Sequence, residues 1–457
     1  MGLTRREVLA GGAAAALGAA GIYELVDRIA GAAPARPAVV TAPPEQHLLD
    51  GLRIVRQDHV PVIVPPLHHE LVTAQLNVDP ADAKDAQKHF ESLLAQIEGG
   101  FPATPAGLGV TVGWGLPYFH RFVPEQTGRY LPRDTRAGKP VLLDAVRFPS
   151  DPKATVLEQN DVVVQLRSDV RAHVDAGVEA LRGSSLLTVT SLRRGFVGGG
   201  FEGRQSLPKQ MAMAANVPGA ELIPGNSELF LGFTSTQHAG MGPGKIANFE
   251  TLGFVDLRGS DYFRYGTHMH VSHIEEDLED WYINFAFPER VSTAFRPYLK
   301  VREGTQTVPQ GPAQVQTAAE VERDFASSGA IGHSASIQTT SRLQQEVVGP
   351  DGTRYPKGTA IPVRADFNTL DNPFLWSIRK SELQPGPAAG VHFVVFNPSS
   401  DDFHRNRLAM DGVLPGKRLA LSPRSRGQGI NSVLQTTHRQ NYLVPPRVHR
   451  SFPLAEL

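Results

Sequence analysis

The sequence predicts an α+β fold that is built from two tandem units of the same design, each with an antiparallel sheet. Segments in which apolar and polar residues alternate, as in strands, are interleaved with segments whose apolar residues recur every three or four positions, as in helices. The order strand, helix, strand, strand, helix begins twice along the 457 residues. This is the order of a ferredoxin-like unit. We therefore expect two ferredoxin-like units arranged as in a dimeric α/β barrel.

The first unit is expected at residues 46–250. Its predicted elements are a strand at 70–78, a helix at 79–97, strands at 107–115 and 161–167, and a helical pattern within 168–187. The first helix opens with an acidic turn that contains Asp79 and Asp82. Carboxylates are favoured there because the helix dipole stabilises negative charge at its N-terminus.

The second unit is expected at residues 251–412. Its predicted elements are a strand at 266–274, a helix that opens at 275–282, an apolar strand at 390–396 and a helix at 400–410. The last helix again has an acidic start, at Asp401 and Asp402. The second unit therefore repeats the pattern of the first.

The N-terminal residues 1–35 resemble a twin-arginine signal peptide. Arg5 and Arg6 stand before an apolar run of Ala, Gly and Leu, and small residues follow near 32–35, where we expect cleavage. We expect the twin-arginine translocase to export the folded chain to a periplasm, a cell wall or the medium. Because this route carries folded proteins, it also gives a reason to look for a cofactor. Residues 36–45 are expected to form a linker.

The C-terminal segment 413–457 is rich in basic residues. Its cations, set against the single acid Glu456, are Lys417, Arg418, Arg424, Arg426, Arg439, Arg447 and Arg450. We predict a basic tail that wraps the body of the protein or a second copy in a homo-oligomer.

The composition excludes several classes of site. The chain has no cysteine, so disulfides, zinc-thiolate sites, iron–sulfur clusters, thiolate-ligated haem and cysteine nucleophiles are excluded. A formal net charge of −1 gives no global attraction to nucleic acid, and we expect no nucleic-acid partner. The 16 histidines remain as ligands for a metal ion or haem.

Several segments, taken in order, resemble the dye-decolourising peroxidases. They are the strand 107–115 running into 116–119, the strand 160–169, the loop 194–200, the strand 361–368, and the closing strand and helix 390–410. The resemblance is collinear over 46–412. It is closest to a divergent, twin-arginine-exported branch with segments similar to 229–235 and 364–369.

This resemblance implies a haem b cofactor in the second unit, with peroxide as the acceptor and an unidentified reductant. In that family a proximal histidine ligates iron, and a distal arginine and aspartate face the peroxide. His333 matches the position of the proximal ligand, and Arg364 that of the distal arginine, which also contacts haem. Asp366 and Asn368 are expected near the same pocket.

The distal acid is where this sequence departs from the family. The family motif GFxDG would place its aspartate near Gly198, in the segment Gly195–Gly199. Glu202 is the nearest carboxylate that could act as the base, with Asp366 as a second candidate. Because a lost base would slow peroxide cleavage by roughly a hundred-fold, haem binding is a safer expectation than peroxidase turnover.

Three alternatives stay open. His270 competes with His333 as the iron ligand. A metal ion such as zinc, copper or iron could instead bind His268 and His270, which lie on one face of the predicted strand with His273 on the other. The simpler interpretation of these histidines is a packed strand whose side chains are hydrogen-bonded. The chain could also be a haem carrier without catalysis, or process haem for iron acquisition.

Overall fold

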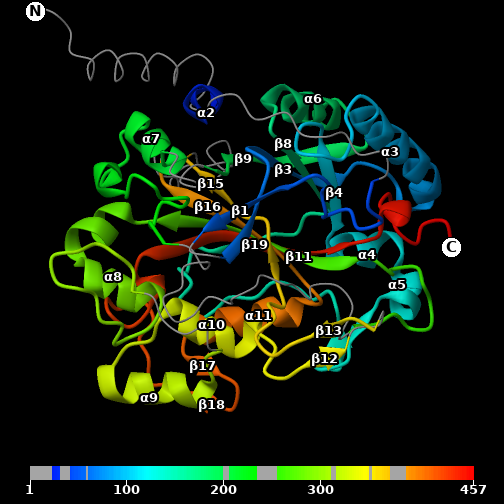
Figure 1. The fold of residues 1–457 in the computed structure, drawn as a ribbon. Coiled ribbons are helices and arrows are strands. Elements are labelled where there is room, and N and C mark those ends of the chain that lie inside the picture. The colour runs from blue at the N-terminus through cyan, green and yellow to red at the C-terminus, as the bar shows by residue number, and fades with distance from the viewer. Residues whose placement is uncertain are drawn as a thin grey trace, which may run out of the picture.

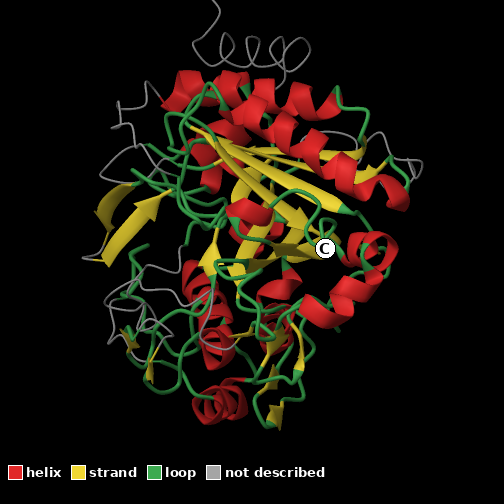
Figure 2. Cartoon of the chain, turned by 90° about the vertical axis from the view of Figure 1, so that its right-hand side faces the viewer, coloured by secondary structure: helices red, strands yellow, loops and turns green. Residues whose placement is uncertain are grey.

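A closed antiparallel barrel forms the centre of the molecule (Figure 1). The computed structural model describes residues 23–30, 42–57, 60–198, 205–233, 255–309, 315–348, 352–370 and 388–457. Within these residues the strands of two sheets are joined at both edges, and helices lie on the outside (Figures 1 and 2).

The first unit has the predicted ferredoxin-like order. Its elements are β3 (His68–Leu76), α3 (Ala83–Glu98), β4 (Gly109–Trp114), β8 (Val162–Ser168), α6 (Arg171–Arg182) and β9 (Leu187–Phe196). The strands are arranged β9-β3-β8-β4 and all their pairings are antiparallel. The apolar faces of α3 and α6 pack on this sheet through residues such as Phe90, Leu94 and Val178.

The second unit repeats this arrangement, so the fold prediction is confirmed. Its elements are β11 (Thr267–Glu276), α8 (Phe287–Ala294), α10 (His333–Ser341), β14 (Val363–Arg364), β15 (Phe367–Thr369), β16 (Gly390–Asn397), α11 (Ser400–Met410) and β19 (Leu434–Val444). The strands are arranged β15-β16-β11-β19, with β14 also paired to β16.

Two short contacts close the barrel. Asn368 of β15 pairs with Phe196 of β9, and Leu443 of β19 pairs with Trp114 of β4. The interior between the two sheets is filled by apolar side chains from both units, among them Leu71, Val163, Met269, Val271, Phe367, Val394, Phe396 and Tyr442. The two units therefore share one core.

Shorter elements connect these parts. They are α2 (Glu24–Ala30), β1 (Arg53–Gln57), β2 (Val60–Val64), α4 (Leu116–Phe122), α5 (Pro124–Tyr130), β5 (Arg133–Asp134), β6 (Lys139–Pro140), β7 (Val156–Leu157), α7 (Leu207–Ala214), β10 (Val255–Asp256), a π-helical turn (Asp280–Asn284), α9 (Ala318–Ser328), β12 (Val347–Val348), β13 (Arg354–Tyr355), β17 (Val413–Leu414), β18 (Lys417–Arg418) and the 3-10 turns at Pro80–Asp82, Ala220–Leu222, Ile430–Ser432 and Arg447–His449. None of the helices in the described ranges is both long and apolar enough to span a bilayer.

The segment 413–457 differs from the predicted basic tail. It supplies β19, the fourth strand of the second sheet, so the expected unit boundary at 412 leaves out part of that unit. The basic residues led to the prediction of a tail, but in the folded protein acidic side chains neutralise two of them. Arg439 pairs with the buried Asp151, and Arg450 pairs with Glu91 and Glu98 of α3.

The helix predicted to open at 275–282 also begins later than expected. Ile274 and Glu275 still belong to β11, where they pair with β16. Helical structure starts at Leu278, runs into the π-helical turn Asp280–Asn284, and α8 follows it. Sheet pairing overrides the local acidic signal for a helix start.

Candidate functional site

Strand pairing gathers the predicted polar residues on one face of the second sheet. Arg364 stands opposite Val395 of β16, and Asn368 stands opposite Val391. Because residues two apart in a strand share a face, these positions and Asp366 lie on the outer face. Val395 packs there against α11, so this is the face that the helices cover.

Arg364 and Asp366 form a two-point ion pair. The guanidinium donates from Nε to Oδ1 at 2.9 Å and from Nη2 to Oδ2 at 2.7 Å. The Asp366 carboxylate raises the pKa of Arg364, and burial opposes this. The Arg364 side chain is 41% exposed while that of Asp366 is 8% exposed. Two parallel hydrogen bonds fix the plane of the guanidinium, which keeps a positive charge at this face.

His333 is the first residue of α10, directly after the N-cap Gly332. Burial, together with the positive charges of Arg364 and Arg407, lowers the pKa of His333 to about 4. The imidazole is therefore neutral at pH 7, which is the form that ligates metals. The structure brings His333 within electrostatic reach of Arg364.

In the part of the chain that the structure describes, the Nδ1 nitrogen of His333 lacks the hydrogen bond that usually orients a ligating histidine. This atom is buried and has no hydrogen-bond partner among the described residues. Ligating histidines normally donate this N–H to a carboxylate or carbonyl oxygen, which sets the ring's orientation. The donor type and charge state thus fit an iron ligand, whereas the orienting partner is not among the described residues.

Glu276, at the end of β11, is a neighbour that the sequence did not reveal. Burial and the negative charge of Asp366 raise the pKa of Glu276 to about 8. Its Oε2 atom is buried without a hydrogen-bond partner among the described residues. In the sequence, Glu276 belongs to the acidic run 275–280, which predicts the start of a helix and not a site residue. At neutral pH it holds a proton beside the ion pair.

We expect the substitution Glu276→Gln to change how stability depends on pH. A glutamate in the unfolded chain loses its proton near pH 4.5, whereas folded Glu276 keeps it up to about pH 8. The folded state therefore binds the extra proton, and this group's contribution to the free energy of unfolding falls as the pH rises through that window. Glu276→Gln should raise the denaturation midpoint at pH 8 and change it little at pH 4.

The matched control is the exposed Glu279. Glu279→Gln should leave the difference between the two pH values as in the parent chain. The assignment fails if Glu276→Gln and Glu279→Gln give the same pH profile in thermal or urea denaturation.

The two other candidate acids have different outcomes. Glu202 lies outside the described residues, which break off between 198 and 205. At the position of the missing aspartate, Gly198 has a φ of 120°, a backbone conformation that side-chain-bearing residues rarely adopt. Asp366 is close to the site, but Arg364 engages both of its oxygens.

His270 has both ring nitrogens in hydrogen bonds. Nδ1 lies 2.7 Å from Asn441 Oδ1, and Nε2 lies 2.6 Å from Ser272 Oγ. The ring also stacks on Phe403 of α11, with 3.3 Å between ring centroids. His268 shares this face of β11 and is fully buried. Because both ring nitrogens of His270 are hydrogen-bonded and its ring is stacked, the structure favours a packed strand over a metal site at this residue.

A second histidine cluster lies inside the barrel. His392, His273 and His438 stand side by side on β16, β11 and β19. Burial, together with the positive charge of the buried Arg193, lowers the pKa of His273 to about 3. Because these three histidines are far apart in the sequence, no motif predicts that they lie together. No three His, Asp or Glu side chains in the described ranges are placed to hold a metal ion.

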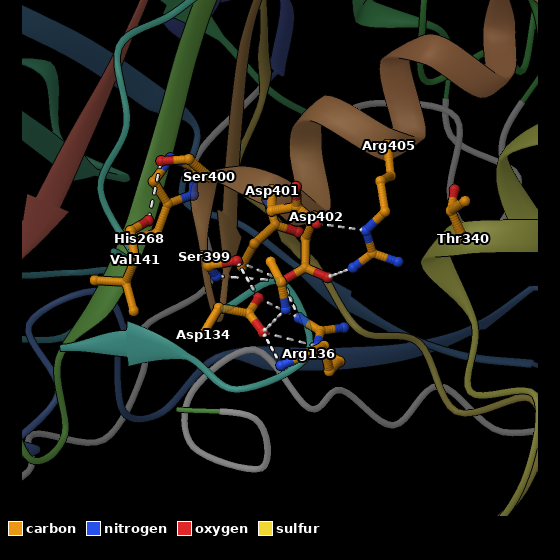
Figure 3. A network of polar contacts seen from close by, with 12 residues as sticks. Asp134, Arg136, Val141, His268, Thr340, Ser399, Ser400, Asp401, Asp402 and Arg405 are labelled. Atoms are coloured by element: carbon orange, nitrogen blue, oxygen red, sulfur yellow. Dashed lines mark hydrogen bonds and ion pairs between the residues drawn. The ribbon is translucent and has the colours of Figure 1, made fainter. Parts of the chain in front are cut away.

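A polar clamp holds the N-terminus of α11 against the first unit (Figure 3). Arg136 donates to Asp134 at 2.9 Å and to Asp402 at 2.7 Å, and Ser399 also donates to Asp134. Asp134 and Asp402 are almost fully buried. Since α11 packs on α10, the clamp supports the helix that begins at His333.

Two described cavities are small. One, of about 20 Å³, is lined by residues that include His270, Phe403 and Asn441; the other has about 10 Å³. A water molecule needs about 10–15 Å³, so neither could hold a macrocycle, and neither is lined by His333. The case for haem at His333 therefore rests on the donor set and its charge, not on a preformed cavity.

Comparison with solved structures finds one that shares this fold and others with lower scores. The DyP-type peroxidase from Cellulomonas bogoriensis matches with a TM-score of 0.51 and 17% identity, over 89% of this chain and 96% of that one. The DyP-type peroxidase from Streptomyces coelicolor matches with a TM-score of 0.48 and 18% identity, over 84% and 89%. At 17% identity the likeness to the Cellulomonas bogoriensis structure shows the fold alone.

No curated protein sequence matches this chain. One family model does, over residues 66–446, and its description is a family of unknown function, DUF7405. That span includes both ferredoxin-like units, from the start of β3 to the end of β19. The chain belongs to the family DUF7405.

Proposed function

We propose that this chain binds haem b and acts as a peroxide-dependent oxidoreductase of the dye-decolourising type. The observation that carries the proposal is the neutral imidazole of His333 in electrostatic reach of the Arg364–Asp366 pair. The shared fold with the Cellulomonas bogoriensis enzyme supports it. Export by the twin-arginine translocase and an unidentified reductant belong to the same proposal.

Each residue has a distinct role in this proposal. His333 would ligate iron, and the bound haem would supply the redox chemistry of peroxide cleavage. Arg364 would stabilise negative charge on bound peroxide, since its guanidinium is always protonated. Asp366 orients Arg364 through the two-point pair. Glu276 holds a proton at neutral pH within electrostatic reach of Asp366, and it would be the proton-bearing group at this face in place of Glu202.

A second function keeps the cofactor and loses the catalysis. Gly198 provides no carboxylate at the position of the distal aspartate, which favours a haem carrier or a protein that processes haem for iron acquisition. The non-haem alternative on His268 and His270 has less support, because both nitrogens of His270 are already bonded.

Visible absorption tests the cofactor. We expect the protein, purified from cells supplied with iron and a haem precursor, to show a Soret band. His333→Gly should abolish or shift that band, and added imidazole should restore it by occupying the vacated space. The exposed His89 gives the matched control, and His89→Gly should keep the band unchanged.

Three outcomes discriminate the candidates. Without a Soret band, even after haem titration, all the haem functions are wrong. If His270→Ala removes the band while His333→Gly keeps it, the ligand is His270. If haem binds but stopped-flow mixing with peroxide leaves the spectrum unchanged, the carrier function replaces the peroxidase.

A further inference from the structure

The segment just ahead of the expected cleavage site is built into the folded body. Tyr23 is 4% exposed and Val26 is 0% exposed. Both belong to the core cluster that contains Phe196, Leu207 and Met211. Helix α2 packs on α7. A segment that is removed after export has no reason to occupy a core position.

Polar contacts fix the same segment. Tyr23 Oη lies 2.9 Å from Thr369 Oγ1 and accepts a hydrogen bond from the backbone N–H of Leu370 at 3.1 Å. Asp27 Oδ1 lies 2.6 Å from Nε2 of the buried His68. These contacts specify a register for the segment, which apolar packing alone would not do.

The docking place is the joint between the two sheets. Phe196 of β9 lies beside the Tyr23 ring, with 6.3 Å between centroids, and pairs with Asn368 of β15. Removing residues up to 35 would uncover this joint and leave the buried N–H of Leu370 without its tyrosine acceptor. An unsatisfied buried donor costs about 1–3 kcal/mol.

We propose that Tyr23–Ala30 is a permanent part of the mature protein, where it acts as a strap over the joint. Removal of the leader takes place upstream, among Gly18–Gly21, where glycine and alanine supply the small residues that a signal peptidase requires. This moves the processing site away from 32–35, where the sequence alone placed it.

The N-terminus of the exported protein tests the position of cleavage. The full chain is expressed in a bacterium with a working twin-arginine system, and the mature protein is digested and analysed by mass spectrometry. We expect the N-terminal peptide to contain Tyr23–Ala30. A mature N-terminus between 31 and 36 overturns the proposal.

Thermal denaturation of the full chain tests the packing without relying on export or haem. Val26→Ala and Tyr23→Phe should each lower Tm by about 2 °C or more. The matched controls Val448→Ala and Tyr298→Phe, at side chains that are 81% and 59% exposed, should leave Tm unchanged. Equal Tm values for all four variants also overturn the proposal. Neither experiment depends on a cofactor, so failure here and failure of the peroxidase function are distinguishable.

Discussion

The substitution Asp151→Asn is expected to lower the free energy of unfolding by about 3–5 kcal/mol, because it breaks a buried ion network. Asp151 Oδ1 accepts from Arg439 Nη2 at 2.6 Å and from Arg407 Nη2 at 3.2 Å, and Oδ2 accepts from the Phe148 N–H at 2.7 Å. Asp151 and Arg439 are each 1% exposed. Asparagine keeps the shape and removes the charge, so Arg439 remains buried without its counter-ion.

The pKa of Arg439 shows how strongly this site depends on the carboxylate. Burial lowers the pKa of Arg439 to about 10, and Asp151 is the main group that opposes this. Asp261, whose side chain is 80% exposed beside Arg264, gives the matched control, since exposed pairs contribute about 0–1 kcal/mol. Urea denaturation followed by circular dichroism compares Asp151→Asn with Asp261→Asn. Similar midpoints for the two variants would contradict the prediction.

The second large effect is expected for Gly332→Ala, one residue before the candidate ligand. An added Cβ would lie 2.1 Å from the carbonyl oxygen of Phe295 and 2.5 Å from the backbone nitrogen of Arg296. That same oxygen accepts a hydrogen bond from the Ala335 N–H of α10. Since backbone atoms cannot rotate away, α10 must shift, at a cost of about 3 kcal/mol. His333 moves with it.

A glycine in open space provides the control. A Cβ at Gly128, inside α5, would meet no atom within 4 Å, and alanine there should stabilise the protein by about 0.5–1 kcal/mol. Denaturation midpoints test the packing, and haem titration of both variants tests the position of His333. If Gly332→Ala is as stable as Gly128→Ala, the prediction that Gly332 is needed for close packing of α10 on the end of α8 is wrong.

The sequence predicted the repeated fold because the strongest patterns coincide with the best-paired elements. The helix expected at 400–410 is α11 to the residue, and the apolar strand at 390–396 is all but the last residue of β16. By contrast, the strand β19 was not predicted from the sequence. Its inward positions include His438 and Gln440 and its outward ones include Arg439, so the alternation of apolar and polar residues is lost where the barrel interior is itself polar.

The candidate site was predictable only where neighbours in sequence remain neighbours in space. Arg364, Asp366 and Asn368 share a face because they are two residues apart. His333 joins them through the packing of α10, a helix rich in Ser and Thr whose buried face is polar and which has no apolar period to detect. Glu276 and the row of His273, His392 and His438 depend on strand register, which spacing along the chain does not encode.

The closing strand also sets the order in which this molecule can form. β19 pairs with β4 about 330 residues earlier in the chain and with the full length of β11. Such distant contacts are slow to form because a long loop must first be closed. β19 follows every other strand of the barrel in the chain, so the barrel stays open until the ribosome has made residues 434–444. Until the barrel closes, chaperones can bind its open edges. A chain truncated before residue 434 should aggregate through the free edge of β11.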